Sequence, residues 1–278
     1  MILKKRLDII LVERGLVKSR EKARALVLEG KVYVDGKKVE KAGTLIKKNS
    51  DIKIYKKNHD YVSRGGIKLE KALEKFNINV KGKKILDVGA STGGFTDCLL
   101  LKGAKRVIAV DVGYGQLSWK LRKNSKVIIF ERTNIRYLDP NEIPFLVDMA
   151  TIDLSFISVK KVINNILRLS KDNAEYLTLI KPQFEVDKGM VGKGGIVKDK
   201  KLHKSVLLNL VIFFQHIIGL NIKGITFSPI KGADGNIEFW IYAMKGLTEK
   251  EIIEISFLKN IDDKIESVVT EAHELLNS

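Results

Sequence analysis

A glycine-rich turn placed directly after a buried-strand pattern constrains the fold of this chain more than any other feature. Apolar Ile85-Leu86 leads into Asp87, three glycines follow at Gly89, Gly93 and Gly94, and a helical pattern begins near Phe95. Open parallel sheets bind their ligands at such a strand-to-helix turn. The glycines lack the G-x-G-x-x-G spacing of dinucleotide sites, so we expect a different nucleoside cofactor. The alternative is a tight turn whose glycines serve packing alone.

Apolar segments on either side of this turn alternate with helical ones, which is typical of a doubly wound, mostly parallel α/β sheet. A helix is expected from Ile67 to Phe76, a mobile loop over Gln183–Lys198, a buried helix within Val206–Leu220 and a helical charged tail after Thr248. Seven strands are predicted, over Lys84–Val88, Arg106–Val110, Lys126–Phe130, Phe145–Ile152, Tyr176–Ile180, Lys223–Phe227 and Ile237–Ala243.

The first sixty residues form a separate basic segment. They contain 17 Lys and Arg against 8 Asp and Glu, a net charge of +9 within the +17 of the whole chain. The pattern predicts two helices, Leu7–Arg14 and one capped by Ser19, then a hairpin turning at Asp35-Gly36. We expect a small α+β domain over residues 1–58, a linker over 59–66 hinged at Gly65-Gly66, and a catalytic domain over 67–278.

Clustered positive charge of this kind favours a polyanionic partner, and nucleic acid is the principal candidate. Two alternatives stay open, an anionic membrane surface and a solvated charged face with no ligand. The basic side chains expected to contact RNA are Arg6, Lys18, Arg20, Arg24, Lys31 and Arg64.

Polar residues at the ends of the second and third strands extend the cofactor site. Asp111 can accept both ribose hydroxyls of a nucleoside, and Thr133-Asn134 can read an adenine edge. An acidic residue, the glycine turn and a second-strand acid together favour S-adenosylmethionine. The residues expected to bind it are Asp87, Gly89, Ala90, Ser91, Gly93, Gly94, Phe95, Asp111, Val112, Thr133, Asn134 and Asp153.

Several longer motifs, in this order, resemble the TlyA or hemolysin A family. They are Val62–Gly66, Leu86–Thr96, Asp111–Leu117, Asp153–Ser158, Lys181–Glu185 and Gly235–Glu238. The resemblance implies an RNA-binding module of ribosomal-protein type joined to an FtsJ-like, Rossmann-like class I methyltransferase sheet of seven strands. It also implies methylation of ribose 2′-hydroxyls, of cytidine in particular, in ribosomal RNA or ribosomal subunits. The linker departs from the Arg-x-Trp-Val of some members, since it reads His59-Asp60-Tyr61-Val62.

Four dispersed residues, Lys68, Asp153, Lys181 and Glu238, are the catalytic candidates. A ribose hydroxyl is a poor nucleophile, so its site must align it and accept its proton. Lys181 ends the fifth strand, where its amine can act as the base, and Asp153 ends the neighbouring strand and can position it. Lys68 and Glu238 complete a mixed-charge network. Taken singly, each of the four is typical of a surface ion pair.

The remaining composition narrows the setting. The single cysteine, Cys98, permits no intrachain disulfide and suits the cytoplasm, where we expect a monomer. Four histidines show no metal-ligand spacing, so no metal is expected. Neither a signal peptide nor an apolar span is apparent, so stable membrane insertion is not expected. A hemolysin-like membrane-active protein and a non-catalytic ribosome-assembly factor are the alternative functions.

Overall fold

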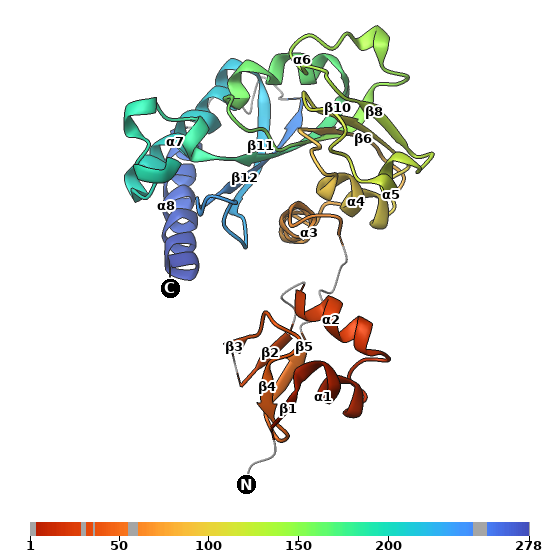
Figure 1. Cartoon of the computed structure of the whole chain (residues 1–278). Helices are drawn as coiled ribbons and strands as arrows, with labels where there is room; N and C mark the ends of the chain where they lie inside the picture. Colours follow the sequence, from red (N-terminus) through yellow and green to blue (C-terminus); the bar gives the residue numbers. More distant parts are fainter. Residues whose placement is uncertain (1–3, 29–31, 36, 55–60, 247–254, 278) are drawn as a thin grey trace. The chain divides into compact units, whose positions relative to one another are not determined.

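The protein divides into two compact units, residues 1–60 and 61–278 (Figure 1). The computed structural model describes residues 4–28, 32–35, 37–54, 61–246 and 255–277. Each unit is built around an apolar core of its own. The two units are therefore described one at a time.

The first unit is a small α+β domain with the two expected helices and the expected hairpin. The hairpin joins β2 to β3, and β2 also pairs with β5. A ladder of β1 with β4 was not predicted. Gly30, Lys31 and Gly36 lie outside the described residues. The elements are β1 (Lys4–Arg6), α1 (Leu7–Glu13), α2 (Arg20–Leu28), β2 (Val32–Val34), β3 (Lys37–Lys38), β4 (Leu45–Lys47) and β5 (Ile52–Ile54).

Ser19 caps α2 as predicted, because its hydroxyl oxygen accepts a hydrogen bond from the backbone N–H of Lys22 at 3.2 Å. The apolar faces of both helices are buried against the strands. This core consists of Leu7, Ile10, Leu11, Ala23, Val27, Val32, Val34 and Ile46.

The second unit contains the predicted seven-stranded, mostly parallel sheet, in the order β11-β12-β10-β9-β6-β7-β8. The strands from β10 to β8 run parallel, and β12 runs antiparallel to both of its neighbours. Their bounds are β6 (Lys84–Val88), β7 (Arg106–Val110), β8 (Val127–Phe130), β9 (Val147–Ile152), β10 (Ser170–Ile180), β11 (Leu220–Phe227) and β12 (Phe239–Lys245).

Two apolar layers cover the sheet, because successive strand residues face opposite sides. Ile85 packs in one layer with residues of α3 and α4, whereas Leu86 packs in the other with residues of α6, α7 and α8. The helices are α3 (Gly65–Lys75), α4 (Gly94–Leu101), α5 (Trp119–Arg122), α6 (Ile163–Arg168), α7 (Lys200–Ile212) and α8 (Ile255–Asn277). Short 3₁₀ turns occupy Pro140–Glu142, Val159–Lys161, Pro182–Phe184, Lys188–Met190 and Lys193–Gly195.

The apolar run Val206–Leu220 is helical as predicted as far as Ile217, and only its end is corrected, because Leu220 belongs to a strand. Helix α7 ends at Ile212, a π-helical turn covers Phe213–Ile217, and β11 begins at Leu220. Periodicity alone does not separate a buried helix from a strand in such a run. Among the helices that the structure describes, none combines the length and apolar character needed to cross a bilayer.

The glycine pair Gly65-Gly66 does not form a hinge, which is a second correction. Both residues lie in the first turn of α3, and Gly66 is buried. A Cβ on Gly66 would lie 2.2 Å from the ring of Tyr61, and one on Gly94 would lie 2.9 Å from the backbone nitrogen of Gly66. Gly94 is therefore needed because α3 and α4 begin in close contact, and Gly66 is needed because the ring of Tyr61 packs against it.

We expect Gly94→Ala to destabilise the protein by about 1–3 kcal/mol, the usual range for overpacking a filled core. The added methyl would meet Ser63 Oγ at 2.2 Å as well as the α3 backbone. Thermal unfolding of the variant measures the loss. Gly189→Ala is the control, because no atom lies within 4 Å of its added methyl. Equal melting temperatures for the two variants would contradict the close contact.

Candidate active site

A cavity of about 330 Å³ lies at the carboxyl ends of the parallel strands. This is the edge where open α/β sheets bind ligands. Six of the predicted cofactor residues line it, namely Gly89, Ser91, Asp111, Val112, Thr133 and Asp153. The other lining residues are Val88, Val110, Gln116, Ile135, Leu154, Ser155 and Phe156.

Strand register explains why the turn after β6 begins with glycine. Val88 pairs with Ile152 of β9, so the next residues, Gly89 and Asp153, lie side by side. A Cβ on Gly89 would stand 2.2 Å from the carbonyl oxygen of Asp153, and Gly89 has a φ of +83°. Only glycine meets both conditions without strain. The absent side chain leaves the cavity open beside Asp153.

Asp111 is held at the end of β7 by backbone donors. Its carboxylate accepts hydrogen bonds from the backbone N–H groups of Ser91 at 2.8 Å and Gly113 at 2.7 Å. These bonds join the turn after β6 to the turn after β7. Because the carboxylate also lines the cavity, its remaining acceptor positions can face a pair of ribose hydroxyls.

Six predicted cofactor residues do not line the cavity: Asp87, Ala90, Gly93, Gly94, Phe95 and Asn134. Gly93 lets the turn pass Leu121, because a Cβ there would lie 2.2 Å from Leu121 Cδ1. Phe95 stacks on Trp240 at 5.6 Å in the core. The side chain of Asn134 accepts a hydrogen bond from the backbone N–H of Arg136. These residues shape the turns around the cavity.

Asp87 is fully buried and has an internal role. Its carboxylate accepts hydrogen bonds from the hydroxyls of Thr96 on α4 at 2.6 Å and Thr151 on β9 at 3.3 Å. Burial, the largest effect, and the nearby Asp153 carboxylate together raise the pKa of Asp87 to about 7, against the opposing hydrogen bonds of the two hydroxyls. Asp87 thus connects three elements beneath the cavity.

Lys181 and Asp153 form an ion pair at the cavity wall. Lys181 Nζ lies 2.6 Å from Asp153 Oδ1 and donates a hydrogen bond to Ser155 Oγ at 3.0 Å. Both side chains are mostly buried, with exposed fractions of 13% and 21%. Asp153 and Ser155 together restrict the position of the amine. Because both residues line the cavity, the amine is held beside it.

Lys68 and Glu238 form the second ion pair, with Lys68 Nζ 2.6 Å from Glu238 Oε2. Lys68 projects from α3, and Glu238 directly precedes β12. Because β12 is antiparallel to β10, its first residues lie at the edge where the parallel strands end. Ile180 accordingly pairs with Phe239, which makes Lys181 and Glu238 neighbours.

The electrostatics of Glu238 bring all four candidates together. Burial raises the pKa of Glu238 above its ordinary value, while the charge and hydrogen bond of Lys68 act to lower it. The charges of Asp153 and Lys181 also act on this carboxyl, which is only 2% exposed. The structure therefore assembles Lys68, Asp153, Lys181 and Glu238 into one network of alternating charge.

Phe156 is a candidate site residue that the sequence analysis missed. Its ring is 90% exposed, lies 5.1 Å from the ring of Phe184 and borders the cavity. Its φ of +66° is rare for an aromatic residue, and such strain is concentrated at functional sites. Ser155 and Gln116 were missed as well. Ser155 and Phe156 lie within the Asp153–Ser158 motif, which was the available signal.

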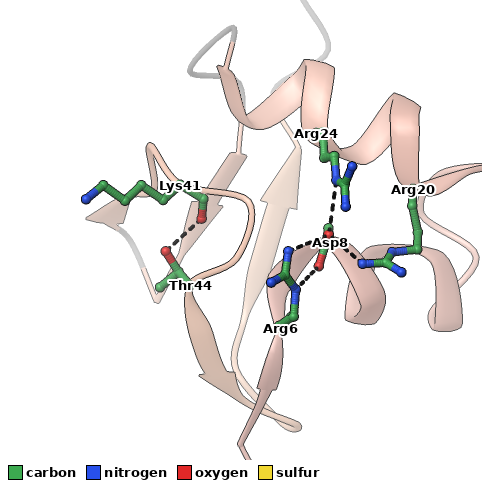
Figure 2. A network of polar contacts seen from close by, with 6 residues as sticks. All are labelled: Arg6, Asp8, Arg20, Arg24, Lys41 and Thr44. Atoms are coloured by element: carbon green, nitrogen blue, oxygen red, sulfur yellow. Dashed lines mark hydrogen bonds and ion pairs between the residues drawn. The ribbon is translucent and has the colours of Figure 1, made fainter.

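The predicted RNA-binding residues fall into different settings. Arg6, Arg20 and Arg24 surround the buried carboxylate of Asp8 (Figure 2). Lys18 is exposed, whereas Lys31 lies outside the described residues. Arg64 belongs to the second unit and directly precedes α3. Its guanidinium donates a hydrogen bond to the carbonyl of Lys231 at 3.2 Å.

Comparison with known proteins assigns both units to families. Residues 61–245 match the FtsJ-like methyltransferase family, and residues 5–52 match the S4 domain family. The fold and the site thus define an FtsJ-like methyltransferase that carries an S4 domain.

Relatives that match nearly the whole chain identify its family more specifically. The chain is 44% identical over 277 residues to YqxC of Bacillus subtilis, named as an rRNA methyltransferase, covering 98% of this chain and 95% of that protein. It is 40% identical over 267 residues to the 16S/23S rRNA (cytidine-2′-O)-methyltransferase TlyA of Mycobacterium tuberculosis, covering 96% and 97%. A solved structure from Streptococcus thermophilus, described as a hemolysin, superposes with a TM-score of 0.74 at 37% identity. The match covers 100% of this chain and 98% of that protein. The chain therefore belongs to the TlyA family.

The Lys68–Glu238 pair should control stability in a pH-dependent way. We expect Lys68→Met to cost about 3–5 kcal/mol near neutral pH, because it leaves a buried carboxylate unpaired. Without Lys68 the pKa of Glu238 rises further above its unfolded value. The loss should therefore grow as pH rises through the folded pKa and shrink at acidic pH.

Denaturant unfolding at several pH values measures this effect. The matched control is Lys68→Met combined with Glu238→Gln, which removes the titrating group and should remove the pH dependence. A loss of stability that is the same at acidic and neutral pH in the single variant would contradict the buried ion pair.

Proposed function

We propose that this protein transfers a methyl group from S-adenosylmethionine to the ribose 2′-hydroxyl of a cytidine in ribosomal RNA. One observation carries the proposal: Asp153 lines the cofactor cavity and also pairs with Lys181, so the cavity and the charged network form one site. The two family assignments support the reaction class and the RNA partner.

The cavity suits the nucleoside part of the cofactor. It is mostly lined by small or apolar residues, with Asp111 and Asp153 as its carboxylates. Asp111 would accept the two ribose hydroxyls of the cofactor, and Thr133 stands beside the adenine position. S-adenosylmethionine, when bound, would supply a sulfonium methyl group that an oxygen nucleophile can attack.

The charged network would prepare that nucleophile. The Lys181 ammonium, which is paired with Asp153, would first give a proton to solvent. Its neutral amine would then accept the proton of the 2′-hydroxyl as the hydroxyl oxygen bonds to the methyl carbon and the bond from that carbon to sulfur breaks, leaving a neutral thioether. Asp153 and Ser155 hold the amine in place. Lys68 and Glu238 would orient the ribose from the other side. Because these groups are already fixed in the folded protein, little reorganisation accompanies the reaction.

Phe156 provides a place for the target base. An exposed aromatic ring beside a methyltransferase cavity can stack on a base turned out of its RNA helix. Such stacking would hold the nucleotide while its ribose enters the charged network.

We further infer a division of labour in the chain. Residues 1–58 would bind RNA, and residues 61–278, the second unit, would perform catalysis, in a cytoplasmic monomer. Two buried ion pairs beside the proposed cofactor cavity favour a catalytic role over that of a non-catalytic assembly factor. A membrane-active function has no comparable support among the residues that the structure describes.

The central test is methyl transfer from radiolabelled S-adenosylmethionine to ribosomal RNA. Wild-type protein should label the RNA, and mapping should place the methyl on a cytidine 2′-oxygen. Lys181→Ala should lower the turnover number by at least about 100-fold, the contribution of a general base, with little change in RNA affinity. Lys181→Arg should also fail, since a guanidinium stays protonated and cannot accept the proton.

The controls separate the alternatives. Lys188→Ala removes an exposed lysine of the same sheet edge and should leave turnover near wild type. Near-normal turnover in Lys181→Arg would mean that Lys181 only positions the ribose. Absence of any labelling by the wild-type protein on naked RNA, ribosomal subunits and assembled ribosomes would refute the methyltransferase proposal.

Cofactor binding has its own test at Asp111. We expect Asp111→Ala to weaken S-adenosylmethionine binding by about tenfold or more, because it removes a charged acceptor of two hydroxyls. Isothermal calorimetry measures the dissociation constant. Asp187→Ala makes the same charge change outside the cavity and should bind normally. Equal affinities for the two variants would rule out the assigned ribose contact.

A further inference from the structure

Asp8 is a buried carboxylate surrounded by three arginines, and the proposed chemistry does not use it (Figure 2). Asp8 lies in the first turn of α1 and has no exposed surface. Arg6 precedes that helix, and Arg20 and Arg24 project from α2. The carboxylate therefore joins two helices and a strand end of the first unit.

Most N–H donors of the three arginines do not contact Asp8. Arg6 uses Nε and one terminal nitrogen at 3.0 and 3.1 Å, Arg20 one terminal nitrogen at 3.1 Å, and Arg24 its Nε at 3.4 Å. Each guanidinium has five N–H donors. Within the described residues, the three guanidiniums make no other hydrogen bond. Their side chains stay 43–52% exposed.

Charge is in excess around Asp8. One carboxylate contacts three guanidiniums, and only the exposed Glu21 carboxylate also acts on the charges of Arg20 and Arg24, so positive charge remains in excess at the surface. Hydrogen bonds from Arg6, opposed by burial and assisted by Arg20, hold the pKa of Asp8 well below its usual range. One arginine would suffice to compensate this carboxylate, so the other two point to an additional anionic ligand.

Arg6 is also held from its other side. A Cβ on Gly43 would lie 3.2 Å from a terminal nitrogen of Arg6, so the guanidinium packs directly on this glycine. Thr44 closes the turn, since its backbone N–H and its hydroxyl both donate to the carbonyl of Lys41, at 3.0 and 2.7 Å (Figure 2). The guanidinium is thus ordered before any ligand arrives.

We propose that Asp8 is a positioning residue that holds Arg6, Arg20 and Arg24 as a preassembled site for the phosphates of the RNA backbone. The proposal rests on the proposed function, in which this unit binds ribosomal RNA. Guanidiniums recognise phosphate oxygens through paired N–H donors, and their outward donors suit that geometry. Ordering the side chains in advance lowers the entropy cost of binding.

The Asp8→Asn variant separates two possible roles of Asp8, because a role through charge alone and a role in positioning predict opposite changes in RNA affinity. Removal of a negative charge should by itself tighten binding to a polyanion. Loss of positioning should instead weaken it by about tenfold to a hundredfold, as two or three long side chains must then be ordered on binding. Fluorescence anisotropy with a labelled ribosomal RNA transcript, at several salt concentrations, measures the dissociation constant.

Glu21→Gln is the matched control, because it adds the same charge on an exposed site of α2 beside Arg20. It should bind RNA as tightly as wild type or more tightly. Asp8→Asn at the affinity of Glu21→Gln would overturn the positioning role while leaving the proposed function intact. Failure of the wild-type chain to bind ribosomal RNA would overturn both.

A second variant covers the case in which Asp8→Asn does not fold, as judged by circular dichroism. Arg20→Lys with Arg24→Lys keeps the net charge but removes the planar forks that can contact Asp8 and phosphate together. RNA affinity should fall at least about fivefold at constant charge, since each lysine acts as a point charge. Unchanged affinity in this double variant would overturn the proposal.

Discussion

The candidate active site depends on the burial of two ion pairs at one edge of a sheet. A buried charge is tolerated only when it is paired and hydrogen-bonded, so each of the four side chains needs its partner in place. Lys68 comes from α3, Asp153 and Lys181 follow parallel strands, and Glu238 precedes the antiparallel strand β12. The pairing therefore requires that these elements be fixed relative to one another, and the packing of the second unit provides this.

Close backbone contacts supply that rigidity, and glycine makes them possible. Gly89 allows the ends of β6 and β9 to meet, whereas Gly94 allows α3 and α4 to begin side by side. Beneath them Asp87 connects β6, α4 and β9 through two hydroxyls. The residues of the glycine turn thus contribute in two ways: Gly89 and Ser91 line the cavity, and Gly94 lets α4 begin beside α3, the helix that carries Lys68.

Two buried carboxylates show how the surroundings decide the behaviour of the same chemical group. Asp8 accepts hydrogen bonds from three guanidiniums, and the pKa of this carboxyl is lowered. Glu238 has one ammonium in contact and a carboxylate nearby, so the effect of burial exceeds that of the pairing and the pKa of this carboxyl is raised. The first arrangement leaves positive charge at the surface and suits the binding of an anion. The second arrangement leaves a nearly balanced network, which suits the handling of a proton.

Sequence alone determined the features that depend on local pattern. Strands β6 and β7 agree with their predicted bounds, and the glycine turn, Asp111, Asp153 and Lys181 were placed at strand ends because alternation and turn chemistry are short-range properties. Glu238 lies in a family motif and Lys68 closely follows another, but no local pattern could pair them, since they stand 170 residues apart. Only the tertiary structure decided that Asp87 is internal, that Gly65-Gly66 begins a helix, that Phe156 borders the cavity, and that Asp8 gathers three arginines. Each of these depends on which distant segments come into contact, and such contacts are set by the packing of the whole unit.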